Sequence, residues 1–222
     1  RLVGSEMCIR DRYRLLDFEI QLPEEITNLM NGGGLPSPEM MNFYVDEKDR
    51  IFFIDFEIDQ SLIEIERKIL QYNSIDKDTP VEQRKPIKLF IYSYGGELDA
   101  MFSFIDVVAL SKTPVWTINA GIAMSAALVM LLSGQKRFAL PHSTALIHSG
   151  SGGTQGTFEQ SKMAMDYYEK QVVKMREYIM AHSTIDKKTM TKNKAKDWYL
   201  DANEQVNFGI VDKICDDVDE FN

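Results

Sequence analysis

The sequence predicts an α/β fold in which short strands alternate with helices along most of the chain. Runs rich in Ile, Phe and Tyr, such as IKLFIYS at Ile87 to Ser93, are typical of buried strands. The stretch QSLIEIERKILQYN, which begins at Gln60, has apolar residues at spacings of three and four, as an amphipathic helix does. This alternation implies repeated βαβ units, a largely parallel sheet and helices on both of its faces.

The first half of the main domain follows this pattern closely. A strand is expected within RIFFIDFEID, which starts at Arg50, and a helix within the stretch that follows it. The polar run KDTPVEQRKP connects this helix to the strand at Ile87 to Ser93. Gly95 and Gly96 end that strand, and ELDAMFSFIDVVALS predicts the next helix, which Pro114 stops.

The second half continues with the strand VWTINAG and a helix that starts at about Ser125. Two short strands, KRFAL and STALIHS, flank the turn-forming Pro141. A long helix is expected from Phe158 to Ser183, and a shorter one from about Lys187 to Lys196. In parallel sheets, functional sites gather beyond the carboxyl ends of the strands.

The composition is that of a soluble globular protein, with 44% hydrophobic and 27% charged residues. A net charge of -9 argues against a nucleic-acid-binding surface and against a polybasic membrane anchor. The longest apolar run is far too short to span a bilayer. With only two cysteines, a reducing, cytoplasmic compartment is expected.

The chain divides into three expected parts. Residues 1–12, RLVGSEMCIRDR, lack any helical or strand period and resemble the translation of a sequencing adaptor, so we interpret them as a scar. Residues 13–49 form a leader that contains the loop-forming run NGGGLPSP. Residues 50–222 form the main domain. Without the scar, Cys215 is the sole cysteine, and a disulfide within the chain is impossible.

Three features that could support catalysis fall at predicted strand exits. Ser125 lies at a strand-to-helix turn, where free N–H groups and the helix dipole favour negative charge. His148 ends the strand TALIH and precedes the flexible run SGSGGTQG, as suits a general base. Gly95 and Gly96 could direct a backbone N–H into a cleft. Taken one by one, each also fits a structural role, as a packed serine, a structural histidine or a simple turn.

No metal or organic cofactor is expected. The two other histidines, His142 and His182, are interpreted as structural, and the three histidines do not form a metal-ligand spacing with carboxylates or cysteines. The glycines after IYSY match neither a phosphate-binding loop nor a dinucleotide fingerprint.

The order YSYGG, GIAMSAA, LPHSTALIHSGSGGTQG, a long helix and DWYLDANEQVNFGIVD resembles the proteolytic subunit of the Clp protease family. The resemblance covers about residues 50 to 215 and includes the spacing between motifs. It implies the crotonase-like Clp protease fold, with the run Gly150 to Gly156 leading into a long handle helix. By similarity, Ser125 is the nucleophile, His148 is the general base, and the N–H groups of Gly96 and Ala126 are the oxyanion donors.

The chain departs from the family pattern at the acid of the triad. Counted back from GIVD, the position of the catalytic aspartate falls on Asn193, so Asn193→Asp would be expected to raise activity. Asp197 lies four residues on, on the same face of the expected helix, and is a possible substitute. The chain also has Tyr94 where the family usually has proline, and the leader does not follow the family's axial hairpin.

The resemblance implies an ATP-dependent serine endopeptidase subunit that degrades unfolded proteins to short peptides. Such subunits form stacked heptameric rings, and an AAA+ unfoldase supplies the substrate. The alternative is a non-catalytic or weakened ring subunit with a structural role, which Asn193 favours and the retained Ser125 and His148 oppose. A crotonase-type acyl-CoA enzyme shares the fold, but its chemistry does not call for this serine and histidine.

Overall fold

The computed structural model describes residues 45–221, and the described residues from Arg50 onward form one compact unit. The predicted scar and the predicted leader up to residue 44 lie outside the described residues. None of the described helices is both long and apolar enough to cross a membrane.

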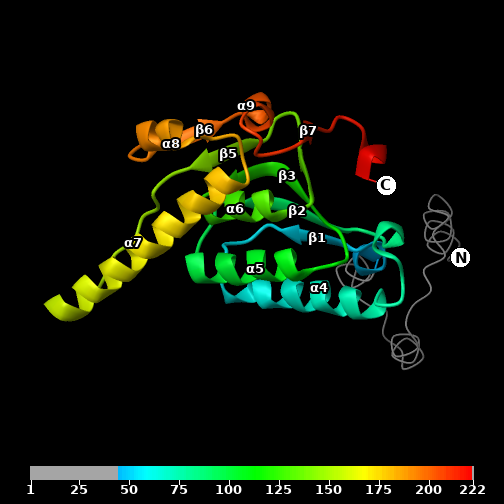
Figure 1. Ribbon diagram of the computed structural model, residues 1–222, viewed down its shortest axis with the longest axis horizontal. Helices are drawn as coiled ribbons and strands as arrows, with labels where there is room; N and C mark the ends of the chain where they lie inside the picture. The colour runs from blue at the N-terminus through cyan, green and yellow to red at the C-terminus, as the bar shows by residue number, and fades with distance from the viewer. Residues whose placement is uncertain (1–44, 222) are drawn as a thin grey trace, which may run out of the picture. The chain divides into compact units, whose positions relative to one another are not determined.

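The centre of this unit is a mainly parallel sheet, shown in Figure 1. Its strands are β1 (Ile51–Ile54), β2 (Ile87–Ser93), β3 (Val115–Met124), β4 (Lys136–Ala139), β5 (Thr144–Ile147), β6 (Trp198–Leu200) and β7 (Lys213–Ile214). The main order is β1-β2-β3-β4-β7, and all of these neighbours are parallel. The first half of β3 pairs with β4, and its last residues pair with β5. The end of β3 and the end of β5 therefore lie side by side.

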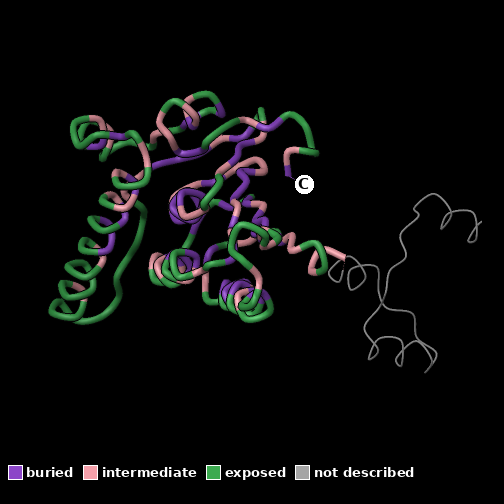
Figure 2. The backbone as a smooth tube through the Cα atoms, turned by 45° about the vertical axis from the view of Figure 1, so that its right-hand side comes forward, coloured by how far each residue is buried: buried purple, intermediate pink, exposed green. Residues whose placement is uncertain are grey.

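Helices α4 (Ile63–Ile75), α5 (Leu98–Leu110) and α6 (Ala126–Ser133) form the layer on one face of the sheet. The apolar positions that predicted α4 are buried in the main core, as the helical spacing requires. Every residue of α6 from Ala126 to Leu132 is buried, which explains why its sequence is apolar all round. In Figure 2 the buried residues gather toward the middle of this unit, and the exposed residues lie mostly on its outside.

Helices were expected on both faces of the sheet, but the opposite face differs from this expectation. In the described part of the chain, it carries a smaller aromatic cluster around Phe138, which the C-terminal 3-10 helix η4 (Val218–Phe221) closes with Phe221. The Phe221 ring makes edge contacts with Phe90 at 5.4 Å and with Phe138 at 5.8 Å between centroids. Toward the edge, Phe53 stacks on Phe90 but stays 52% exposed.

The C-terminal third contains α7 (Phe158–Ala181), α8 (Lys187–Asn193) and α9 (Ala202–Asn207). A capping box at Thr157 starts α7, which is the expected long helix and extends away from the sheet in Figure 1. Its first half is almost entirely exposed, as Figure 2 shows. The helix expected to reach Lys196 ends earlier, at Asn193, because the chain leaves the helix to form β6.

A buried ion pair fixes the start of β1 to the end of α4. The Arg50 guanidinium donates two hydrogen bonds to the Asp76 carboxylate, at 2.6 and 2.7 Å, and both side chains are about nine-tenths buried. The Asp76 carboxylate also accepts a hydrogen bond from the Thr113 hydroxyl at 3.0 Å. These hydrogen bonds satisfy a charge that would otherwise be costly to bury.

Candidate active site

Ser125 occupies a tight turn between the end of β3 and α6. Its backbone has φ 56° and ψ −122°, a conformation that residues other than glycine rarely adopt. The turn is held by the Ser125 N–H, which donates to the Leu146 carbonyl of β5 at 2.9 Å. The Ser125 side chain does not cap α6, so it has no structural hydrogen bond of the kind that a serine there usually makes. Backbone strain of this kind is often found where a side chain must be presented for function.

The loop after β2 passes directly over this turn. A Cβ atom on Gly95 would lie 2.7 Å from the Met124 carbonyl oxygen and 2.8 Å from the Ser125 Cβ, so only glycine fits at this close approach. Gly96 forms a parallel bridge with Ile58, in which the Ile58 N–H donates to the Gly95 carbonyl and the Glu97 N–H donates to the Ile58 carbonyl.

This bridge decides the direction of the Gly96 N–H. The groups on either side of Gly96 are turned toward Ile58, so the N–H of Gly96 itself points to the opposite side. Ala126 is the first residue of α6, and its N–H therefore has no acceptor within the helix. The two expected oxyanion donors thus come from neighbouring segments, on either side of the Gly95 and Ser125 contact.

His148 follows β5 directly, and the pairing of β5 with β6 brings an acid to it. The two strands are antiparallel, with Ile147 opposite Trp198, so the next pair along the ladder is His148 and Asp197. The distance from His148 Nδ1 to Asp197 Oδ1 is 3.8 Å. The His148 side chain is 22% exposed and the Asp197 carboxylate is 64% exposed. The contact is an ion-pair distance rather than a hydrogen bond.

Asn193, expected at the acid position, makes its side-chain hydrogen bond within its own helix. It is the last residue of α8, and its amide donates to the Thr189 carbonyl at 3.0 Å in its own helix. The expectation that Asp197 shares a helix face with Asn193 is wrong, because the helix ends before Asp197. Counting residues back from GIVD placed the acid at Asn193, whereas the strand register places Asp197 beside the histidine.

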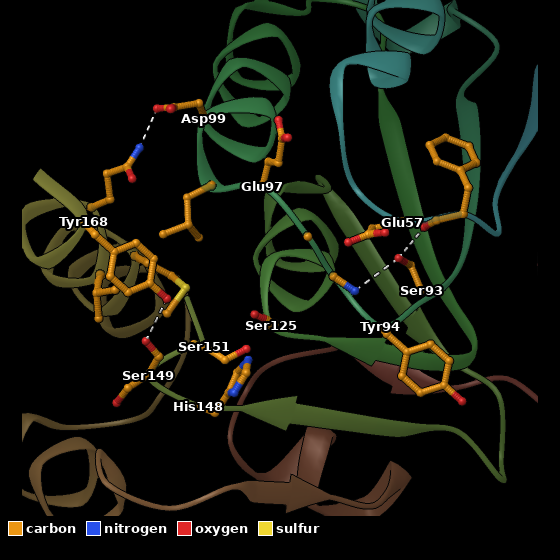
Figure 3. Close-up of a pocket in the computed structure, with 18 of the residues that line it drawn as sticks. Glu57, Ser93, Tyr94, Glu97, Asp99, Ser125, His148, Ser149, Ser151 and Tyr168 are labelled. Atoms are coloured by element: carbon orange, nitrogen blue, oxygen red, sulfur yellow. Dashed lines mark hydrogen bonds between the residues drawn. The ribbon is translucent and has the colours of Figure 1, made fainter. Parts of the chain in front are cut away.

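Ser125 and His148 line the same pocket, together with Gly95 and Gly96. This cavity, which we call the Ser125 pocket, has a volume of about 860 Å³. Figure 3 shows the Ser125 and His148 side chains both directed into it. Its far side is formed by the middle of α7, where Tyr168 and Met175 line the cavity. The pocket is large enough for several side chains of a bound peptide.

The residue after His148 connects three elements around the pocket. Arg176 of α7 donates to the Ser149 hydroxyl at 2.6 Å, and this hydroxyl in turn donates to the Lys194 carbonyl. Tyr168 of α7 donates to the Ser149 carbonyl at 3.4 Å. Ser149 therefore links the long helix to the segment that carries Asp197.

Sequence reasoning missed these contacts and the acidic side chains of the pocket, Asp55, Glu57, Glu97 and Asp99. The strand β6 is only three residues long, which is too short to give a clear alternating pattern. Contacts between α7 and the segment after His148 leave no local signal in the sequence. Within residues 45–221, no group of three His, Cys, Asp or Glu residues is arranged to hold a metal ion.

Comparison with known families gives a consistent result. The family model described as Clp protease matches residues 43–218. The chain is 36% identical over 133 residues to a Treponema denticola protein named ATP-dependent Clp protease proteolytic subunit 2, covering 59% of this chain and 66% of that protein. It is 31% identical over 169 residues to the ATP-dependent Clp protease proteolytic subunit of Dehalococcoides mccartyi, covering 75% and 82% of the two chains.

Among solved structures, the chain is similar to that of a mutant of ClpP1 from Listeria monocytogenes. The TM-score is 0.68 at 24% identity, and the match covers 79% of this chain and 96% of the other. At this identity the likeness shows the fold. The predicted α/β fold of the Clp protease and crotonase-like type is confirmed.

Proposed function

The chain belongs to the Clp protease family, and we propose that it is an active serine endopeptidase subunit that cuts unfolded polypeptides into short peptides. The single observation that carries this proposal is the Ser125 pocket. Three separate parts of the sequence meet there, namely the strained Ser125, His148 and the glycine pair Gly95 and Gly96.

In the proposed mechanism, the Ser125 hydroxyl attacks the carbonyl carbon of the scissile peptide bond while His148 accepts the hydroxyl proton. The carbonyl oxygen becomes an oxyanion that accepts hydrogen bonds from the N–H groups of Gly96 and Ala126. His148 then donates its proton to the leaving amine as the C–N bond breaks, which leaves an acyl-enzyme. Water, deprotonated by His148, hydrolyses the ester and releases the second product.

Asp197 is the proposed acid of this triad in place of Asn193. A carboxylate near Nδ1 favours the tautomer that leaves Nε2 free to accept the serine proton, and it stabilises the imidazolium that forms. At 3.8 Å the contact is longer than a hydrogen bond, but catalytic hydrogen bonds are often long without substrate and shorten in the complex.

The alternative of a non-catalytic or weakened ring subunit rested on Asn193. Because Asn193 bonds within α8 and Asp197 lies beside His148, Asn193 no longer favours this alternative. The exposed Asp197 carboxylate and its long contact favour modest activity in the isolated subunit instead.

The proposal includes assembly of identical subunits into stacked heptameric rings in the cytoplasm, with an AAA+ unfoldase as partner. It is supported by exposed apolar side chains on the first half of α7, where Phe158 is 78% and Met163 is 71% exposed. Relatives are named as subunits of an ATP-dependent protease. The mass of the purified protein in solution tests assembly, and a stable monomer contradicts it.

Labelling with a fluorophosphonate probe tests the catalytic proposal, because the probe reacts only with an activated serine. We expect one adduct, located at Ser125 by mass spectrometry, and no adduct in the Ser125→Ala variant. We expect Ser125→Ala to abolish peptidase activity as well. Protein that has assembled into rings but leaves Ser125 unlabelled would show that the subunit is not an active protease.

A further inference from the structure

The charge of the Ser125 pocket is unusual for a site that binds a peptide backbone. Its lining includes four acidic residues, Asp55, Glu57, Glu97 and Asp99, and among the described residues no Lys or Arg lines it. Arg176 lies close by, but its guanidinium is turned to the Ser149 hydroxyl and it is not part of the lining. The four carboxylates therefore make this lining negative, and they come from the segment after β1 and from the start of α5.

Two of these acidic residues lie on the two segments that meet at Gly96, the proposed oxyanion donor. Glu97 follows Gly96 directly, and Glu57 precedes Ile58, which is held against Gly96 by hydrogen bonds of 2.9 and 2.7 Å. Figure 3 shows Glu57 and Glu97 on the side of the pocket formed by β2 and α5. The two glutamates thus lie on adjacent segments, and each is next in sequence to a residue of the Ile58 and Gly96 bridge, where the scissile carbonyl would bind.

These two glutamates make no structural contact that would explain them. Both side chains are exposed, and neither takes part in an ion pair or side-chain hydrogen bond within the described part of the chain. Asp99 differs, because it accepts hydrogen bonds from the Tyr167 hydroxyl at 2.8 Å and from the Gln171 amide. The Asp99 carboxylate is therefore fixed in place, whereas those of Glu57 and Glu97 are available to a ligand.

Negative charge beside an oxyanion opposes catalysis unless something neutralises it. The carboxylates of Glu57 and Glu97 raise the energy of the developing negative charge at the scissile carbonyl. A substrate cation that binds to them removes this penalty and adds its own attraction, and a concave site concentrates the field. The same arrangement repels an acidic substrate segment.

We propose that the Ser125 pocket selects cationic polypeptide segments, in which Lys or Arg flanks the cleaved bond, and that Glu57 and Glu97 determine this preference. The inference rests on the proposed function for the cleavage step, but the preference in binding does not require turnover. Both glutamates act on the substrate through charge and take no part in the transfer of protons.

The test uses three internally quenched peptides that share one apolar residue directly before the cleaved bond. The residue that precedes this apolar residue and the residue that follows the bond are both Lys, both Gln or both Glu. For the assembled wild-type protein at low salt, we expect kcat/KM to be about tenfold higher for the Lys peptide than for the Gln peptide, and lowest for the Glu peptide. The difference should shrink as ionic strength rises, because salt screens exposed charges. In the Glu57→Gln/Glu97→Gln variant we expect the Lys-to-Gln ratio to fall below about threefold.

Glu82→Gln is the matched control, since Glu82 is an exposed glutamate on the 3-10 helix η3 (Val81–Gln83), which contributes nothing to the pocket lining. It should retain the full ratio. Binding of the same peptides, fluorescently labelled, to the Ser125→Ala variant separates the two proposals. A Lys preference in binding without any cleavage by the wild type supports the charge selection and contradicts the protease. Equal affinity and equal cleavage of the three peptides, or a ratio that survives in the double variant, overturns the charge selection.

Discussion

Replacing Asp197 by Asn tests directly which residue serves as the acid. The isosteric change removes the carboxylate charge that lies 3.8 Å from His148 Nδ1. At that distance, a unit charge stabilises an imidazolium by about 1 kcal/mol in the dielectric of water and by about 4 kcal/mol at a dielectric constant near 20. Because Asp197 is 64% exposed, the lower part of this range applies.

We therefore expect Asp197→Asn to lower kcat/KM by about 5- to 30-fold, which corresponds to roughly 1–2 kcal/mol. This loss is far smaller than the roughly 10⁴-fold loss that follows the same change in a trypsin-like triad, where the aspartate is buried. Asn193→Asp should change kcat/KM by less than about threefold. It only removes the amide that donates to the Thr189 carbonyl and places a charge at the unfavourable end of α8.

The assay is initial-rate cleavage of one quenched peptide by proteins whose assembly has been checked by mass in solution. Asp78→Asn, at an exposed position after α4, serves as the control for loss of one negative charge. An Asp197→Asn enzyme with wild-type activity, together with an Asn193→Asp enzyme activated tenfold or more, would refute the assignment of the acid.

Three further outcomes follow from the contacts described above. Asp76→Ala should lower the free energy of unfolding by about 3–5 kcal/mol in a urea titration, because it leaves the nine-tenths buried Arg50 guanidinium without its carboxylate. The hydrogen bonds from Arg50 lower the pKa of Asp76. The contribution of the Asp76 carboxylate to stability should therefore be complete above about pH 4 and be lost as the pH falls through the folded-state pKa. Between about pH 5 and 2, the free energy of unfolding should fall more steeply with pH in the wild type than in Asp76→Asn. Gly95→Ala should abolish fluorophosphonate labelling, because φ is +101° there and the new Cβ would lie 2.7 Å from the Met124 carbonyl oxygen; full labelling would show that the loop can move away from the Ser125 turn.

Much of the fold could be predicted because the local pattern and the tertiary contacts agree. The run IKLFIYS forms β2 over the same residues, and the apolar spacing after Gln60 forms the buried face of α4. The long helix from Phe158 begins at a capping box that the residues themselves supply. In β2 and α4, the apolar side chains are buried in the main core, so the local apolar pattern carries the information.

The acid position could not be predicted in the same way. Asn193 and Asp197 are four residues apart, and both are plausible by count. The difference lies in where α8 ends and in how β6 aligns with β5, and a three-residue strand has no pattern of its own. The acidic wall of the pocket was missed for a related reason, since Glu57 and Glu97 are brought together only by the bridge between Ile58 and Gly96.

The sequence by itself determined the order of strands and helices and the residues that end the strands, Ser125, His148 and the two glycines, because these depend on local apolar patterns and on glycine. The tertiary structure alone decided which carboxylate meets His148 and what charge surrounds Ser125. Both depend on strand register and loop pairing, where a shift of one residue moves every side chain to the other face.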